Sequence, residues 1–286
     1  MKILKLDSDL CITCGLRTHH GVSGHVFELI EYFYYFYFYH GVDTMILVPF
    51  PIEPKNFFEC LDKYDFNPNE IETIKGRTIF NSDVQLIYCR NIIFTDGEID
   101  NCKILSKNII FLRCNSLKDL DRANLILQDN RLYNERTNSV HYVKKILLSK
   151  FKRIDCQSDS ALIYGTTNCR SLSYDDLINI DKKYNFNRYI LITNKIQDVP
   201  SNFELKLAPV QNLFSLFKTY IYTKLNYSDY PFDCSPRFPV ECHYYNKDFI
   251  LDSPLIRGLD VRLYDIQNNF DSLFLNKNDR IIDYLI

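Results

Sequence analysis

The feature that most constrains the fold is an alternation of strand-like and helix-like segments. Near the N-terminus, residues 2–6 have the pattern of a short strand, and a loop with three glycines follows. A helix is predicted from an N-cap at Ser23 to a C-terminal glycine at Gly41, and residues 44–48 have the pattern of a second strand. A strand, a crossover helix and another strand form a βαβ unit with a parallel sheet. An α/β fold is therefore expected from the start of the chain.

The alternation continues through both halves of the chain, with helices predicted at residues 174–184 and 210–222. Both halves therefore predict mostly parallel sheets. No linker rich in Gly, Ser or Pro separates them, so the boundary is placed where a basic, helix-like segment at 140–151 gives way to a new strand. This yields an N-terminal domain of residues 1–154 and a C-terminal domain of residues 155–286. The other predicted elements are strands at 84–88, 92–94, 108–112, 160–165, 188–193, 204–207 and 248–251 and a final helix at 277–286.

Charge and cysteine content narrow the range of functions. The formal net charge is −2, from 34 Lys and Arg against 36 Asp and Glu, so the chain has no overall surplus for binding nucleic-acid phosphates. Cys11 and Cys14 form a lone CxxC, and no second pair completes a zinc site. The N-terminus lacks the pattern of a signal peptide. A reducing, cytoplasmic location is therefore expected, with the cysteines acting mostly as small apolar side chains and with no bound metal.

An aromatic run occupies residues 32–39, where eight Tyr and Phe residues follow one another. A membrane-spanning helix needs roughly 20 apolar residues, so no integral membrane segment is expected. The run favours a buried or interfacial helix, and contact with a membrane surface stays open as an alternative.

Residues 233–250 combine a turn, a helix start and a strand. The Ser-Pro dipeptide at Ser235 predicts the turn, and Pro239 suits the first turn of a helix. At such a junction, backbone N–H groups and Arg237 can meet the phosphates of a nucleotide diphosphate, and Glu241 can accept hydrogen bonds from ribose hydroxyls. A helix cap with a surface salt bridge is an equally good interpretation of the spacing.

Two parts of the chain resemble the GT-B glycosyltransferases. Residues 21–29 followed by residues 40–48 resemble the first βαβ unit of that class. The strand end Ile163-Tyr164-Gly165 with Arg170, together with residues 235–241, resembles the donor site of the phage DNA β-glucosyltransferases and related GT4-like enzymes. The resemblance implies two Rossmann-like domains facing each other across a cleft, and it points to a phage-encoded enzyme.

The resemblance also implies the reaction and its residues. A hexose would move from a nucleotide sugar, UDP- or GDP-hexose, to an acceptor hydroxyl, with no cofactor and no metal held by the protein. A carboxylate in the first half would act as base on the acceptor, and Asp96 is the candidate. The donor-binding residues implied are Gly165, Arg170, Lys195, Ser235, Arg237 and Glu241, and the residues implied to line the cleft near donor or acceptor are Gly24, His19 and His25.

The acceptor and the class of protein stay open at this point. DNA with a hydroxymethylated base would need base flipping or single-strand access, and the acidic charge balance counts against it. Glycan, lipid-linked and protein acceptors fit the charge equally well. The rival from another class is a non-catalytic α/β protein that binds a nucleotide or a partner, and no motif supports a nucleoside-processing enzyme. The enzyme is favoured over the non-catalytic protein if one cleft brings together Arg170, Arg237 and Glu241.

Overall fold

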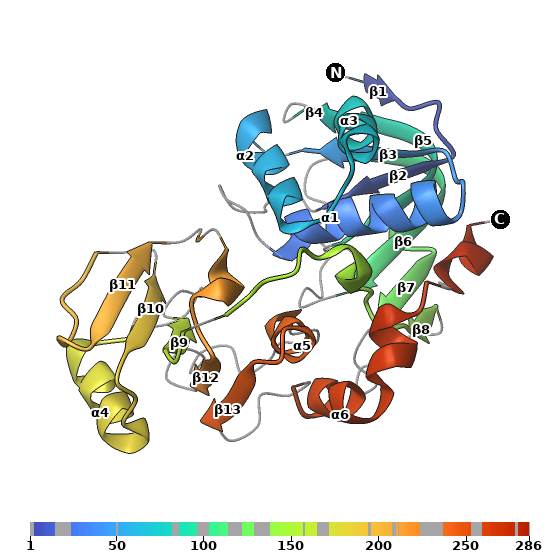
Figure 1. Cartoon of the computed structure of the whole chain (residues 1–286). Helices are drawn as coiled ribbons and strands as arrows, with labels where there is room; N and C mark the ends of the chain where they lie inside the picture. The colour runs from blue at the N-terminus through green and yellow to red at the C-terminus, as the bar shows by residue number, and fades with distance from the viewer. Residues whose placement is uncertain are drawn as a thin grey trace. The chain divides into compact units, whose positions relative to one another are not determined.

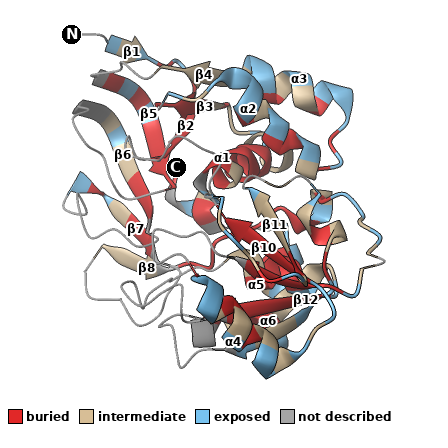
Figure 2. Cartoon of the chain, turned by 90° about the vertical axis from the view of Figure 1, so that its left-hand side faces the viewer, coloured by how far each residue is buried: buried red, intermediate tan, exposed pale blue. Residues whose placement is uncertain are grey.

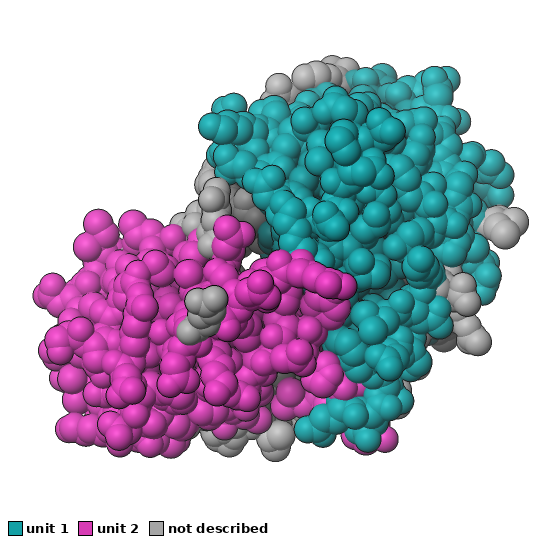
Figure 3. Space-filling view, in the orientation of Figure 1, with its two compact units in different colours: residues 1–152, 267–286 teal, residues 153–266 magenta. Residues whose placement is uncertain are grey.

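The structure is a computed structural model of the 286-residue chain and forms two compact units (Figures 1 and 3). Unit 1 comprises residues 1–152 and 267–286, and unit 2 comprises residues 153–266. The first boundary lies two residues before the predicted one, whereas residues 267–286, which were expected in the C-terminal domain, group with unit 1. The residues that the structure describes are 3–14, 24–49, 51–81, 86–95, 103–113, 122–128, 138–156, 158–164, 172–193, 196–207, 210, 212–223, 237–252, 259–277 and 280–285.

Unit 1 contains an eight-stranded sheet in which every pairing is parallel. Along the sheet the order is β4-β3-β2-β5-β6-β7-β8, and β1 pairs with β5 beside this path. From β2 the chain moves outward through β3 to β4, and it then starts again on the other side of β2 and moves outward from β5 to β8. This order is that of a doubly wound α/β sheet. The strands are β1 (Ile3–Lys5), β2 (Leu10–Thr13), β3 (Thr44–Val48), β4 (Thr78–Phe80), β5 (Leu86–Phe94), β6 (Lys103–Arg113), β7 (Leu125–Gln128) and β8 (Ser139–His141).

The first βαβ unit begins at β2, which the sequence analysis had placed in a loop. Ile3 of β1 pairs with Leu86, and Leu10 of β2 pairs with Asn91, so the two short strands follow one another along β5. The predicted strand at residues 2–6 is real, but it ends before the crossover. Because β2 is the strand that leads into the helix, it defines the centre of the sheet.

Helix α1 (Gly24–Tyr34) and the π-helical turn after it (Tyr35–Tyr39) carry the aromatic run into the core of unit 1 (Figure 2). Among its residues, Tyr32, Phe33 and Phe36 are completely buried. Burying each such side chain contributes about 2–3 kcal/mol to folding, so the run stabilises unit 1 from inside. The backbone then reverses at Gly41, whose φ of 67° favours glycine, and this confirms the predicted helix end. No helix in the described part of the chain is long and apolar enough to cross a membrane.

Residues 142–150, here called the strap, were predicted to lie in a basic helix, and this was wrong. Residues 142–148 are buried, residues 142–147 have no regular secondary structure, and only a short 3₁₀ turn (Leu148–Lys150) follows. Carboxylates of α1 hold the strap: Lys144 Nζ lies 3.1 Å from Glu28 Oε1, and Leu147 N donates to Glu31 Oε1 at 3.2 Å. These tertiary bonds outweigh the weak local preference for a helix.

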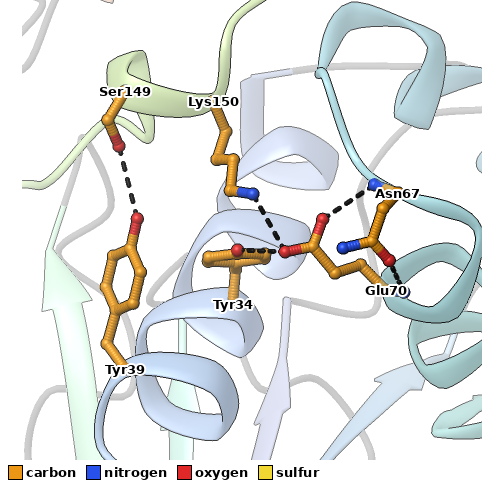
Figure 4. Close-up of polar contacts among 6 residues, drawn as sticks. All are labelled: Tyr34, Tyr39, Asn67, Glu70, Ser149 and Lys150. Carbon is orange, nitrogen blue, oxygen red and sulfur yellow. Dashed lines mark hydrogen bonds and ion pairs between the residues drawn. The ribbon is translucent and has the colours of Figure 1, made fainter.

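The end of the strap is fixed by Glu70 of α3 (Pro68–Gly76), as Figure 4 shows. Lys150 Nζ lies 2.9 Å from Glu70 Oε1, and the Tyr34 hydroxyl donates to the same oxygen. Glu70 also closes a capping box with Asn67. Burial alone would raise the pKa of Glu70, but these hydrogen bonds lower it overall. Burial and the bond to Glu70 raise the pKa of Tyr34 to about 12.

Between β3 and α3 lie α2 (Pro54–Phe58) and a 3₁₀ turn (Glu59–Lys63).

Unit 2 has a second parallel sheet, with five strands in the order β11-β10-β9-β12-β13. On one face, Leu177 and Ile180 of α4 pack into a core with Leu191. On the other face, Cys242 of α5 packs into a core with Phe214. Both units are therefore Rossmann-like α/β sheets, as the alternation predicts. The elements are β9 (Ala161–Tyr164), α4 (Tyr174–Tyr184), β10 (Tyr189–Thr193), β11 (Phe203–Leu207), β12 (Thr219–Thr223), α5 (Arg237–Tyr244), β13 (Asp248–Asp252) and α6 (Leu259–Phe270).

Two helix predictions in the second half were wrong. Residues 210–222 were expected to form an amphipathic helix, but they contain a 3₁₀ turn (Leu213–Ser215) and most of β12. The β12 sequence Thr-Tyr-Ile-Tyr-Thr is rich in β-branched and aromatic residues, which suit a strand beside β9. At the C-terminus, a π-helical turn (Asp271–Leu275) and a 3₁₀ turn (Arg280–Tyr284) replace the predicted final α-helix.

Candidate functional site

The order of the strands indicates where each sheet binds a ligand. In doubly wound sheets, ligands bind outside the carboxyl ends of the strands, at the point where the order reverses. In unit 2 this point lies between β9 and β12, because β10 and β11 extend one way and β13 the other. The chain leaves β12 at Thr223 and returns at α5, which leads into β13. The start of α5 therefore belongs to the connection that follows the strand at the switch point.

Arg237 and Glu241 are brought together on α5. Arg237 is the first residue of the helix, and its Nε donates to Glu241 Oε1 one turn later. The side chains are only 15% and 4% exposed, so the pair is buried rather than the surface salt bridge that the spacing equally allowed. Pro239 lies in the first turn, as predicted, whereas Glu241 lies in the second turn rather than the first.

An aromatic cluster holds this part of α5 in place. The Phe238 ring stacks on Phe214 with centroids 5.0 Å apart, and Tyr245, just after the helix, lies 4.8 Å from Phe214. Burial, followed by the nearby Glu241 carboxylate, raises the pKa of Tyr245. A hydroxyl that stays protonated can donate a hydrogen bond over the whole physiological pH range. The ion pair therefore sits on a helix that is fixed against the core of unit 2.

The corresponding edge of unit 1 lies where β2 and β5 end. Thr95 N donates to Thr13 O at 2.9 Å, and the Thr13 hydroxyl donates to Leu47 O at 2.9 Å. Thr95 is completely buried, and its Oγ1 has no hydrogen-bond partner among the described residues. A buried hydroxyl without a partner costs free energy, which a polar ligand atom would recover. Sequence reasoning missed Thr95, although it directly precedes Asp96 at the same strand end.

Several predicted site residues lie outside the described residues. They are His19, Asp96, Gly165, Arg170, Lys195 and Ser235. Gly24 is the first residue of α1, and an added Cβ there would meet no atom within 4 Å. His25 follows it in α1, but its side chain is not among those described. The predicted gathering of Arg170 with Arg237 and Glu241 therefore stays a prediction, and only the last two are seen together.

The comparisons with known proteins add no family. No protein-family model, curated protein or solved structure matches the chain. Within the described residues, no group of three His, Cys, Asp or Glu side chains is placed to hold a metal ion. Cys11 lies within β2 and Cys14 directly follows it, and both side chains are completely buried. The functional argument therefore rests on the geometry of the two sheet edges.

Proposed function

We propose that the chain is a glycosyltransferase that moves a hexose from a nucleotide sugar to an acceptor hydroxyl. One observation carries the proposal. The Arg and Glu that the sequence resemblance assigns to the donor form an ion pair on the helix that follows the switch-point strand, with the Glu buried and the Arg partly buried. In this proposal Arg237 binds the diphosphate of a UDP- or GDP-hexose, and Glu241 accepts hydrogen bonds from the ribose hydroxyls.

The chemistry would need little beyond charge and position. The bond between the anomeric carbon and the diphosphate oxygen breaks, and its electron pair leaves with the diphosphate. The acceptor oxygen forms the new bond to that carbon, and its proton passes to a base, for which Asp96 is the candidate. Arg237 stabilises the charge that develops on the leaving diphosphate. Because Arg237 is paired with Glu241 in the structure, donor binding would exchange this partner for phosphate and ribose.

A thermal-shift experiment with UDP-, GDP- and ADP-sugars tests the donor site. Binding to the folded state at a free concentration 100 times Kd stabilises a protein by about 2.7 kcal/mol. For a chain of this size the expected rise in Tm is about 5 °C or more for the matching nucleotide sugar. Arg237→Ala should abolish the rise. Arg188→Ala is the matched control, since Arg188 is an exposed residue of unit 2 that is ion-paired with Glu204.

The outcomes separate the two classes of protein. A rise for one nucleotide that is retained in Arg188→Ala and lost in Arg237→Ala supports the donor site, provided that both variants melt cooperatively without ligand. No rise with any nucleotide sugar in a folded sample contradicts the glycosyltransferase and leaves a non-catalytic α/β protein as the better account. A Tm rise that survives in Arg237→Ala means that the nucleotide sugar binds at another site.

A further inference from the structure

A hollow lies in unit 1, away from the carboxyl ends of the strands. Its volume is about 600 Å³, and it is lined by residues 5–9, 88–90 and 106–107. Ligand pockets commonly have volumes of about 300–1,000 Å³. β5 continues for four residues beyond Arg90 to its end at Phe94, a distance of about 13 Å along a strand. The hollow is therefore separate from the edge formed by Thr13 and Thr95.

Tyr88 is the aromatic residue of this hollow. It is 50% exposed, whereas its neighbour Cys89 points into the core and is 2% exposed. Lys5 of β1 pairs with Tyr88, and Ile3, which is 58% exposed, lies two residues earlier on the same face. The Tyr88 carbonyl accepts from Leu6 N at 2.9 Å, but within the described part of the chain the Tyr88 side chain has no hydrogen bond and no ring contact. The exposed ring of Tyr88 therefore gives the hollow an aromatic surface that a ligand can cover.

The charges around Tyr88 nearly balance. Arg90 Nη1 lies 3.2 Å from Asp9 Oδ1, and Lys5 Nζ lies 3.5 Å from Asp7 Oδ1. Lys107 adds one more cation, so three cations face two carboxylates. A polyanion would meet both carboxylates and gain little from cations that are already paired. A neutral ligand rich in hydroxyls can instead donate to the carboxylates and accept from the cations, and such charge-assisted hydrogen bonds are strong.

We propose that this hollow is a binding platform for a neutral oligosaccharide. The apolar face of a sugar ring packs on Tyr88, its hydroxyls donate to Asp7 and Asp9, and Arg90 donates to a hydroxyl or ring oxygen. An aromatic ring with mixed-sign polar groups around it suits this ligand, because sugars also combine C–H faces with a hydroxyl rim. The role of the platform in holding a glycan acceptor rests on the proposed glycosyltransferase function, whereas the binding itself does not.

The test is a binding measurement on the full chain without any nucleotide sugar. The probes are four neutral oligosaccharides, built from glucose, mannose, galactose and N-acetylglucosamine, with a single-stranded oligodeoxynucleotide as the polyanion. At least one oligosaccharide should bind in isothermal titration. Tyr88→Ala should weaken this binding roughly tenfold or more, because the ring supplies the apolar surface on which the sugar face packs. Tyr88→Phe keeps the aromatic ring, so its Kd for the oligosaccharide should stay within about threefold of the wild-type Kd.

Tyr174→Ala is the matched control. Tyr174 lies at the start of α4 in unit 2 and is 49% exposed, almost the same as Tyr88. Because both side chains are half exposed, neither alanine variant should change the Tm by much. The platform is overturned if no neutral oligosaccharide binds, if binding survives in Tyr88→Ala, or if only the oligonucleotide binds and Lys107→Gln weakens it. A failed nucleotide-sugar shift with intact oligosaccharide binding removes the proposed transferase but leaves the platform.

Discussion

Two buried glutamates, Glu70 in unit 1 and Glu241 in unit 2, differ in what their bonds connect. The Glu70 side chain is 10% exposed and the Glu241 side chain 4%, so both carboxylates are well removed from water. Glu70 accepts from Tyr34 and Lys150, which lie 36 and 80 residues away in sequence. The ion pair of Glu241 is with Arg237, four residues earlier on the same helix.

This difference separates a carboxylate that holds the fold from one that can serve a ligand. Loss of the bonds to Glu70 would free the end of the strap from α3 and would break the link between α3 and Tyr34 of α1. The bonds from α1 to Lys144 and Leu147 would remain. The ion pair of Arg237 and Glu241 joins two residues of one helix, so exchanging it for a ligand breaks a pair within α5. Burial and charge alone therefore do not mark a functional site in this chain. The position of Glu241, after the strand at the switch point, is what distinguishes it.

The largest loss of stability is expected when another ion pair between distant elements is broken, the pair of Glu28 and Lys144. Their side chains are 11% and 4% exposed, and they lie 116 residues apart in sequence. Lys144→Met leaves a buried carboxylate without its cation and should lower the free energy of unfolding by about 3–5 kcal/mol, measured by urea unfolding. Replacing both residues by Met should restore most of this loss.

The control for Lys144→Met is Lys206→Met, which removes a more exposed ion pair with Glu204. The Lys206 and Glu204 side chains are 28% and 36% exposed, so this change should cost less than about 1 kcal/mol. Equal losses in the two variants would contradict the view that the strap depends on its buried ion pairs. Hydrogen exchange of the strap amides would then locate the residues that do hold it.

A smaller effect, with a defined pH dependence, is expected for Glu70→Gln. The substitution should cost about 2 kcal/mol near neutral pH, since it weakens one partly buried ion pair and a capping box. The pKa of Glu70 is lowered in the folded state, so its contribution is present above the unfolded pKa and is lost as pH falls through the folded pKa. The stability difference between wild type and variant should therefore shrink below about pH 4.

Glu72→Gln is the matched control for Glu70→Gln, because Glu72 lies on the same helix in an exposed pair with Lys75. Its side chain is 74% exposed, so the variant should unfold like the wild type at every pH. If the cost of Glu70→Gln were constant down to acidic pH, the ionised form of Glu70 would not be what the fold uses.

Much of the architecture could be predicted from the sequence, because its strands and helices carry strong local signals. Residues 174–184 form α4 between a Ser173 cap and Asn185, as the pattern indicates. The errors fall where tertiary contacts decide. β2 has only four residues, all buried, directly after the charged segment Asp7–Asp9, and its pairing partners lie about 34 and 81 residues further along the chain. The strap has helix-forming residues, but its lysines are fixed by carboxylates of α1 and α3.

The candidate site was predictable only in part. Arg237 and Glu241 were singled out because they lie at a turn that leads into a helix start, which is visible in the sequence, and because this stretch resembles a known donor site. Thr95 was not found, because nothing in a sequence shows that a threonine hydroxyl is buried without a partner. The platform around Tyr88 was missed for a related reason. Its residues come from β1, the segment between β1 and β2, β5 and β6, and only the pairing of these strands brings the segments together.

The smallest effect on stability, and the sharpest test of the comparison, is expected for Glu241→Gln. The amide keeps the size of the side chain, and its oxygen can still accept from Arg237. The free energy of unfolding should therefore change by less than about 1 kcal/mol. The Tm rise with a nucleotide sugar should nevertheless be lost, because the amide is uncharged and replaces one of the two acceptor oxygens that would face the ribose hydroxyls with an NH₂ donor. If instead Glu241→Gln destabilises unit 2 as much as Glu70→Gln destabilises unit 1, Glu241 is a residue of the fold. The donor site would then have to rest on Arg237 alone, and the distinction between the two glutamates would disappear.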